Sequence, residues 1–274
     1  SMFTANGVNY ARTKSAQKGI DEKLSIYMAD FYIDWLKTQK NNRSLGKRVS
    51  WLLDVPELYS QRAPGNTCLS AIEELKNIED RGHSFVEWKR NNSKGCGAIM
   101  RVAPLALAYE FGPIENLDKQ AAEISAITHC HPLGYITSAV LVHIINRIVF
   151  FRNGDKLKDI VLDAKNVVNN LFKGEKHLAE MNYLIDKAIN LAENNNTNTD
   201  RQNISLLGEG WIAEEALAIG LYCALKYQND FSKGIIAAVN HSGDSDSTGA
   251  VTGNILGAWL GYERIEEKWK TNLE

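Results

Sequence analysis

Apolar residues recur along most of the chain with the three- and four-residue spacing of amphipathic helices. Within 20–40, for example, Leu24, Met28, Phe31 and Leu36 fall broadly on one side. No segment alternates apolar and polar residues around Asn-Gly or Asp-Gly turns, as a β-hairpin would. The pattern therefore predicts an all-α fold. Further helices are predicted over 67–77, 98–110, 117–128, 135–152, 156–172, 176–193, 210–227, 231–240 and 247–260.

The chain of 274 residues is long enough for one large domain or two small ones. It contains neither an internal repeat nor a linker rich in Pro, Gly or Ser. The polar, Asn-rich segment 193–202 is predicted to be a loop between two helices. We therefore expect a single compact multi-helix domain over 1–274.

Glycine recurs every four residues at Gly249, Gly253, Gly257 and Gly261, along the last long predicted helix and directly after its end. Each glycine inside a helix costs about 1 kcal/mol relative to alanine. Close approach of another helix, or a ligand surface, would offset that cost. We expect close packing, with this helix running through the middle of the bundle.

Composition narrows the classes of partner. The 31 basic and 33 acidic residues leave a net charge of -2, which argues against a nucleic-acid partner. The most apolar stretch, 136–151, is short and contains His143, Asn146 and Arg147, so no membrane span is expected. The 4 cysteines are far apart and do not form a zinc motif, which is typical of free thiols in a reducing, cytoplasmic protein.

The segment 240–249 precedes the glycine-rich helix and contains two carboxylates followed by hydroxyls. Asp244, Asp246 and Ser247 offer the hard oxygen ligands that Mg²⁺ prefers. The alternative is that Asp246 or Ser247 only caps the following helix. Burial of that helix would favour a metal, because buried acidic groups need a partner for their charge.

A second candidate is the segment 91–101. Gly95 and Gly97 flank one residue, a helix follows, and Lys94 and Arg101 add positive charge. Such a segment can hold a phosphate against free backbone N–H groups. It matches neither of the two common glycine-rich phosphate motifs, so a plain glycine turn is the alternative.

Two further segments contain groups that could be functional. His129 and His131 have a spacing that zinc could use, but no other suitable ligands are spaced near them. A helix-ending turn is the favoured interpretation, and contact of one histidine with a ligand is a third. Glu214 and Glu215 are adjacent at the start of an apolar helix. They either favour the helix dipole or include a buried functional carboxylate.

Taken together and in this order, these segments resemble the ADP-ribosylglycohydrolase family, which includes the bacterial dinitrogenase reductase-activating glycohydrolase. The resemblance covers essentially the whole chain. The matching stretches are Pro64–Cys68, Ser93–Pro104, Thr128–Pro132, Trp211–Leu217 and Gly243–Ser247.

The resemblance implies an all-α hydrolase that cleaves the bond between ADP-ribose and a protein side chain or small acceptor. It implies a site for two Mg²⁺ or Mn²⁺ ions, with Asp244, Asp246 and Ser247 as ligands and the two aspartates acting in catalysis through the metal. His129 matches a histidine beside the bound ribose. The loop that matches the ADP-ribose cradle consists of Ser93, Lys94, Gly95, Cys96, Gly97 and Ala98.

One feature departs from the family pattern. Ser1–Val8 resembles the family stretch that directly follows a Thr/Ser-Asp-Asp motif, so the ligands of that motif and of an earlier Gly-Asp motif are not in this chain. Mg²⁺ takes six oxygens, and the remaining residues supply about half of them. We therefore expect weak or absent metal binding and hydrolysis that is much reduced or undetectable, with a non-catalytic ADP-ribose-binding protein as the alternative.

Overall fold

The computed structural model describes residues 1–19, 23–41, 47–78, 82, 84–108, 112–194 and 197–271. Within these ranges the chain forms helices and no β-strand, apart from one isolated bridge between Gly95 and Ile212. The all-α prediction is confirmed. In chain order the elements are α1 (Met2–Lys18), α2 (Leu24–Gln39), η1 (Trp51–Asp54), η2 (Pro56–Tyr59), α3 (Asn66–Leu75), α4 (Phe85–Trp88), α5 (Ile99–Val102), α6 (Pro104–Leu107), α7 (Ile114–Ala126), α8 (Pro132–Phe150), α9 (Leu157–Leu171), α10 (Leu178–Glu193), α11 (Asp200–Ser205), α12 (Ala213–Lys226), α13 (Phe231–Val239), α14 (Ser245–Leu260), η3 (Tyr262–Arg264) and α15 (Glu267–Lys270).

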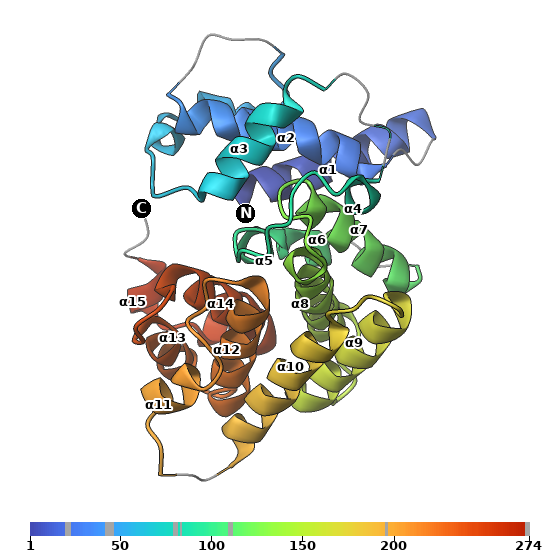
Figure 1. Ribbon diagram of the computed structural model, residues 1–274. Helices are drawn as coiled ribbons and strands as arrows, with labels where there is room; N and C mark the ends of the chain where they lie inside the picture. Colours follow the sequence, from blue (N-terminus) through green and yellow to red (C-terminus); the bar gives the residue numbers. More distant parts are fainter. Residues whose placement is uncertain are drawn as a thin grey trace.

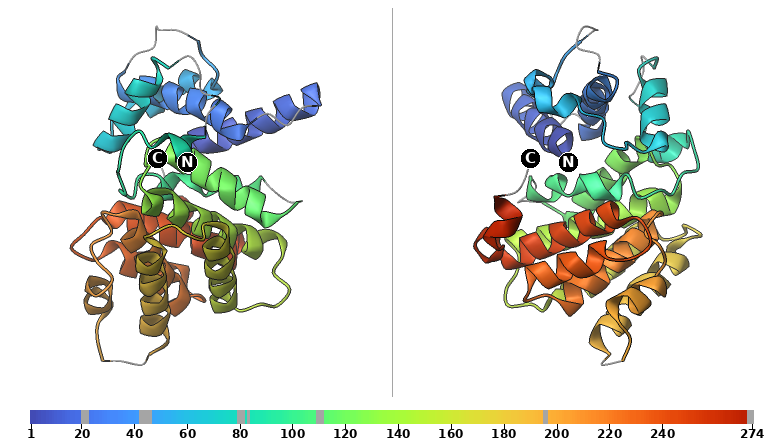
Figure 2. Two further views of the ribbon diagram at one scale, coloured as in Figure 1. Left: turned by 45° about the vertical axis from the view of Figure 1, so that its right-hand side comes forward. Right: turned by 90° about the vertical axis from the view of Figure 1, so that its left-hand side faces the viewer.

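The helices form two groups on either side of a middle layer (Figures 1 and 2). Helices α1, α2 and α3 lie at one end of the molecule, and α9 to α15 lie at the other. Between them, α5, α6, α7 and α8 make the connection, because α1 packs on α6, α2 packs on α7, and α8 packs on α9, α12 and α14. Residues from both groups can therefore meet at the middle layer.

The central helix is α8, in which 15 of 19 residues are buried. It is long and apolar enough to cross a membrane, but 83% of its most apolar window is buried inside the protein. A core helix meets the same criterion of length and composition. Since α7, α9, α12 and α14 all pack against it, α8 organises the hydrophobic core.

The expectation that the glycine-rich helix runs through the middle of the bundle is wrong. Helix α14 buries the face that contains Val251 and Ile255, and its glycines lie on a half-buried face. A Cβ at Gly249 would lie 2.8 Å from a side chain of α13, but one at Gly257 would meet nothing within 4 Å. The glycine spacing therefore reflects close packing only at the start of the helix.

The predicted helix over 98–110 is interrupted. It divides into α5 and α6 with Ala103 between them, and Pro104 begins the second helix. Proline lacks the amide hydrogen that would continue the first helix. Part of the predicted loop 193–202 is also helical, because α11 begins at Asp200 behind a capping box formed by Thr199 and Gln202.

Helix α1 is not predicted by the hydrophobic pattern. Its buried face includes small or polar residues such as Thr4, Gly7 and Ala11, so its amphipathic signal is weak. A Cβ at Gly7 would lie 2.6 Å from Sδ of Met28, which explains why α1 and α2 pack so closely. Only the tertiary contact identifies this helix.

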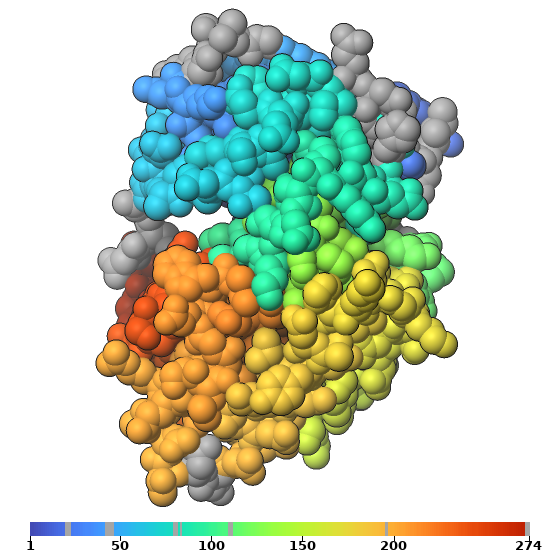
Figure 3. Space-filling view, in the orientation of Figure 1, coloured from blue at the N-terminus to red at the C-terminus, as the bar shows by residue number. Residues whose placement is uncertain are grey.

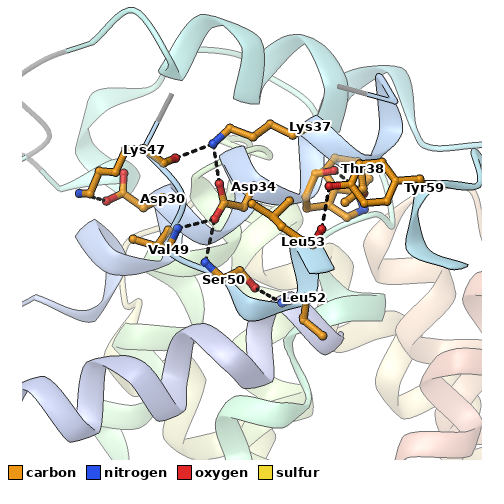
Figure 4. Close-up of polar contacts among 11 residues, drawn as sticks. Asp30, Asp34, Lys37, Thr38, Lys47, Val49, Ser50, Leu52, Leu53 and Tyr59 are labelled. Atoms are coloured by element: carbon orange, nitrogen blue, oxygen red, sulfur yellow. Dashed lines mark hydrogen bonds and ion pairs between the residues drawn. The ribbon is translucent and has the colours of Figure 1, made fainter. Parts of the chain in front are cut away.

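The buried carboxylate of Asp34, on α2, binds the backbone of Val49 and Ser50, which follow α2 in the chain (Figure 4). Asp34 is fully buried, and its Oδ2 accepts hydrogen bonds of 2.8 Å from the backbone N–H groups of Val49 and Ser50. Its Oδ1 lies 2.7 Å from Nζ of Lys37. The Ser50 hydroxyl in turn donates to Oδ1 of Asn6 on α1 at 2.7 Å. These contacts join α1, α2 and the start of η1.

Candidate functional site

The loop from Ser93 to Ala98 is held against the segment before α12. The Cys96 N–H donates to the carbonyl of Trp211 at 3.2 Å, and the Ala213 N–H donates to the carbonyl of Lys94 at 2.8 Å. The Lys94 ammonium also forms an ion pair with Glu214, whose side chain is only 3% exposed. Two segments more than 100 residues apart in the sequence therefore form one unit.

Gly95 and Gly97 lie against the ring of His129. A Cβ on Gly95 would lie 3.3 Å from Nε2 of His129, and one on Gly97 would lie 3.2 Å from Cε1. On the other side, a Cβ on Gly97 would lie 3.1 Å from Sγ of Cys68. Neither glycine has a positive φ, so the reason for glycine here is close packing rather than turn conformation.

A chain of hydrogen bonds orients His129. Arg101 donates to Oγ1 of Thr128 at 2.6 Å, and Oγ1 lies 2.8 Å from Nδ1 of His129. Because an arginine can only donate, the single hydroxyl hydrogen of Thr128 has two acceptors within reach, Nδ1 of His129 and the carbonyl of Ser125 at 3.5 Å. The other ring nitrogen, Nε2, faces the loop glycines.

Arg101 connects several elements at this point. It donates to the carbonyl of Gly97 at 2.8 Å, and its guanidinium lies 4.7 Å from the centre of the Tyr32 ring. It also contacts Sγ of Cys68 at 3.4 Å. Arg101 therefore links α2 and α3 of one helix group to the loop in the middle layer.

His129 is neutral at physiological pH. Burial, and then the nearby charge of Arg101, lower the pKa of His129 to about 3. The side chain is 2% exposed and lies beneath the loop. The geometry thus places His129 behind Gly95 and Gly97, where it supports the loop.

The acidic segment before α14 is held by a close backbone approach. The Asp244 N–H donates to the carbonyl of Glu209 at 2.7 Å. A Cβ on Gly243 would lie 1.8 Å from that same carbonyl oxygen, so only glycine fits. The carboxylate of Glu215 accepts hydrogen bonds of 3.0 Å from the N–H groups of Glu209 and Gly210 and orders this turn.

The capping alternative for the acidic segment is wrong. Helix α14 begins at Ser245, so Asp246 and Ser247 lie inside its first turn, and the N-cap position is Asp244. The side chain of Asp244 makes no capping hydrogen bond. Other contacts must therefore explain the positions of these three polar side chains.

Cys96 brings the loop and the acidic segment together. Its Sγ lies 2.9 Å from Oδ2 of Asp244, and the Ser247 hydroxyl donates to the same sulfur at 3.2 Å. Burial, followed by the hydrogen bond to Asp244, raises the pKa of Cys96 to about 12. The group is therefore a thiol, not a thiolate, at neutral pH.

Asp244 and Asp246 form a close carboxyl pair. Burial raises the pKa of Asp244, but hydrogen bonds from Asp246 and Cys96 outweigh it and lower the pKa below the ordinary value. The pKa of Asp246 is raised by its hydrogen bond to Asp244, by burial and by the neighbouring charge. A neighbouring cation would favour the ionised form of both carboxyl groups.

The donor set is compatible with one side of a divalent cation site. Asp244, Asp246 and Ser247 supply hard oxygen atoms from one helix start, as Mg²⁺ or Mn²⁺ would require. Across the described ranges, no group of three or more His, Cys, Asp or Glu side chains is placed to hold a metal ion. The three residues fit part of a coordination sphere.

Glu214 is the buried carboxylate of its adjacent pair. Its Oε1 contacts Lys94, whereas its Oε2 is buried without a hydrogen-bond partner. Glu215 instead binds the backbone at Glu209 and Gly210. The sequence left two interpretations of these glutamates, a favourable interaction with the helix dipole or a buried functional carboxylate. Glu214 is buried as the second interpretation requires, whereas Glu215 stabilises a turn.

A pocket of about 250 Å³ lies between the two helix groups. The space-filling view shows the hollow between the α3 region and the C-terminal helices (Figure 3). Among the predicted site residues, Gly97 and Asp246 line this pocket, and Lys94, Cys96 and His129 do not. The lining residues are Ser1, Phe3, Thr4, Tyr32, Trp35, Arg62, Ala63, Pro64, Gly65, Cys68, Ile72, Gly97, Met100, Arg101 and Asp246.

The structure thus assembles the predicted segments at one place. The loop, His129 and the acidic segment all meet through Gly97 and Cys96. Tyr32, Trp35 and Arg62 also line the pocket, although no sequence motif assigned them to the site. Tyr32 and Trp35 lie far from the recognised motifs along the chain, whereas Arg62 lies just before the matching stretch Pro64–Cys68 but outside it.

Comparison with known proteins supports one relationship over the whole chain. Residues 2–274 match the sequence model of the ADP-ribosylglycohydrolase family. A solved structure described as an ADP-ribosylglycohydrolase-related protein complex covers 100% of this chain and 76% of its own, with a TM-score of 0.60 and 22% identity. That structural likeness supports the fold.

Individual relatives share 24% to 30% of aligned residues with this chain and are longer than it. Mouse ADP-ribosylhydrolase ARH3 is 26% identical over 213 residues, which cover 69% of this chain and 55% of that protein. An uncharacterized protein of Archaeoglobus fulgidus is 30% identical over 82% of this chain and 65% of its own length. The ADP-ribosyl-[dinitrogen reductase] glycohydrolase of Rhodospirillum rubrum is 24% identical over 77% of this chain and 60% of its own. The chain thus spans less than two thirds of the length of these relatives.

Proposed function

Because the chain belongs to the ADP-ribosylglycohydrolase family, we propose that it binds the ADP-ribose part of a substrate and hydrolyses the bond to the acceptor. The acceptor is a protein side chain or a small molecule. The observation that carries this proposal is the meeting of the loop 93–98 with the Asp244–Ser247 segment at one wall of the pocket.

The charges of the pocket suit this substrate. Arg62 and Arg101 line it and supply positive charge for a diphosphate, while Asp246 adds a carboxylate. Cleavage of a ribosyl bond develops positive charge on the sugar, which a neighbouring carboxylate stabilises. Lys94 is paired with Glu214 and therefore positions the loop rather than adding charge to the pocket.

The proposed cation is Mg²⁺ or Mn²⁺, held by Asp244, Asp246 and Ser247 together with ligands from outside this set. When bound, such a cation lowers the pKa of a water molecule and orders sugar hydroxyls. The residues that line the pocket orient the ribose, because the pocket lies between two packed helix groups.

A second function, binding of ADP-ribose without hydrolysis, is favoured by one observation. No cluster of three or more His, Cys, Asp or Glu side chains that could hold a metal is found in the described part of the chain. Such a protein would bind ADP-ribose equally well in Mg²⁺ and in EDTA. Its affinity would depend on Arg62 and Arg101 rather than on Asp246.

The deciding experiment measures release of free ADP-ribose from an arginine-ADP-ribosylated protein, in Mg²⁺ and in EDTA. We expect Mg²⁺-dependent release that is lost in Asp246→Asn and kept in the matched control Asp155→Asn, an exposed residue before α9. ADP-ribose binding by calorimetry without any release would support the second function. If the protein neither releases nor binds ADP-ribose, both functions are contradicted.

We also propose that the partner is a protein-linked or free ADP-ribose in the cytoplasm, with no nucleic acid or membrane involved. The net charge of -2 supports the exclusion of nucleic acid. Burial of most of α8 supports its role as a core helix. Binding assays with nucleic acid and with lipid vesicles would test this part directly.

A further inference from the structure

Cys96 is the only side chain of the loop 93–98 with a hydrogen bond to the acidic segment among the described contacts. Its Sγ is within hydrogen-bond distance of Oδ2 of Asp244, at 2.9 Å, and of Oγ of Ser247, at 3.2 Å. All three side chains are buried. The contact spans 148 residues to Asp244 and 151 to Ser247, so neither hydrogen bond follows from local structure.

The direction of these hydrogen bonds follows from the number of protons. An ionised carboxylate only accepts hydrogen bonds, so the single thiol hydrogen of Cys96 points at Asp244. The Ser247 hydroxyl donates to this sulfur at 3.2 Å, and its second, more distant acceptor is Sδ of Met100 at 3.6 Å. This turns the lone pairs of Ser247 Oγ away from the sulfur and commits one oxygen of Asp244 to the thiol.

The backbone of Cys96 is itself held in place. Its N–H donates to the carbonyl of Trp211, and the neighbouring glycines lie against His129. The sulfur therefore projects from a rigid support and not from a free loop. A group held on a rigid support can orient its neighbours with little loss of entropy.

We propose that Cys96 is a positioning residue, which orients Asp244 and Ser247 for a divalent cation from behind, without touching the cation itself. This inference rests on the proposed function, because it concerns the same cation. It extends that function by giving the loop a second role. The backbone of the loop lines the pocket at Gly97, while the thiol of Cys96 orients Asp244 and Ser247.

The test uses two substitutions at one position. Cys96→Ala removes both hydrogen bonds, whereas Cys96→Ser keeps one donor and one acceptor. Outer-shell partners of metal ligands typically contribute about 10- to 100-fold to metal affinity. We therefore expect Cys96→Ala to weaken Mn²⁺ binding by about 10-fold, measured by electron paramagnetic resonance, and Cys96→Ser to restore most of it.

Controls separate positioning from general packing. Cys130→Ala removes another buried thiol, whose described side-chain hydrogen bond is to the carbonyl of Ala126, and should leave the Mn²⁺ affinity unchanged. Melting temperatures report any loss of packing in each variant. The S–H stretching band of the wild-type protein, assigned by its loss in Cys96→Ala, should show a hydrogen-bonded thiol.

Three results would overturn the inference: wild-type Mn²⁺ affinity in Cys96→Ala, no rescue by Cys96→Ser, or no Mn²⁺ binding by the wild-type protein. Failure of the proposed function looks different. In that case the wild-type protein neither releases nor binds ADP-ribose, whatever the Mn²⁺ affinities of the cysteine variants.

Discussion

The ring of His129 lies directly against Gly97, so that a Cβ at Gly97 would be 3.2 Å from Cε1 of the imidazole. This contact joins the end of α7 to the loop that lines the pocket. It also gives the loop glycines a packing reason, which adds to the two interpretations drawn from sequence, a phosphate cradle or a plain turn. Several consequences of this arrangement can be measured.

Gly97→Ala should destabilise the protein by about 1–3 kcal/mol, because the new methyl group overpacks the space between His129 and Cys68. Urea unfolding measures this loss. The matched control is Gly257→Ala on α14, where a Cβ meets nothing within 4 Å, and it should stabilise by up to about 1 kcal/mol. Equal stability of the two variants would contradict the packing argument.

The stability of the ligand-free protein should fall as the pH drops from about 6.5 toward 3. The folded protein keeps His129 neutral down to its pKa of about 3, whereas in the unfolded chain the histidine binds a proton near its ordinary pKa of 6.5. The unfolded state therefore binds more protons in this window, so the free energy of unfolding rises with pH there and is fully regained above 6.5.

His129→Gln tests this pH dependence by removing the titrating group. Urea unfolding of both proteins at several values across the window should give a steeper slope for the wild type, by up to about 1.4 kcal/mol per pH unit. His177→Gln, a substitution of a partly exposed histidine, serves as the control. Parallel pH profiles for the wild type and His129→Gln would show that His129 is not the responsible group.

The Lys94–Glu214 pair should be strongly coupled. Lys94→Ala leaves the Glu214 carboxylate buried with neither oxygen bonded to a side chain, and we expect a loss of about 1–3 kcal/mol. The double variant Lys94→Ala/Glu214→Leu removes the buried charge as well and should be more stable than Lys94→Ala alone. A double-mutant cycle by urea unfolding measures the coupling, and additive effects would exclude it.

Asp34→Ala should destabilise the protein by about 3 kcal/mol, because it leaves two backbone N–H groups unpaired and removes the partner of Lys37. The control is Asp30→Ala on the same helix. Its described ion pair joins the 75% exposed side chain of Lys47, so a change of about 0.5 kcal/mol is expected. A similar loss in both variants would argue against the anchoring role of Asp34.

The helical class and most helix positions could be predicted from sequence, because the spacing of apolar residues is a local property that survives in the folded protein. Helix α1 escaped prediction because its buried face includes residues as small as Gly7 and Ala11. The break at Pro104 was visible in the sequence as a proline, yet the apolar pattern continued across it. Hydrophobic spacing alone therefore misplaces helices whose contacts are made by small residues.

The sequence by itself determined which segments contain reactive groups, since Asp244, Asp246 and Ser247 are hard ligands wherever they lie. Only the tertiary structure decided that Cys96 holds two of them and that His129 supports the loop from behind. The reason is physical. The type of a residue determines which hydrogen bonds or metal ligands its side chain can offer. Whether Cys96 meets Asp244, 148 residues away in the sequence, depends on how the helices pack around α8. No local pattern records that packing.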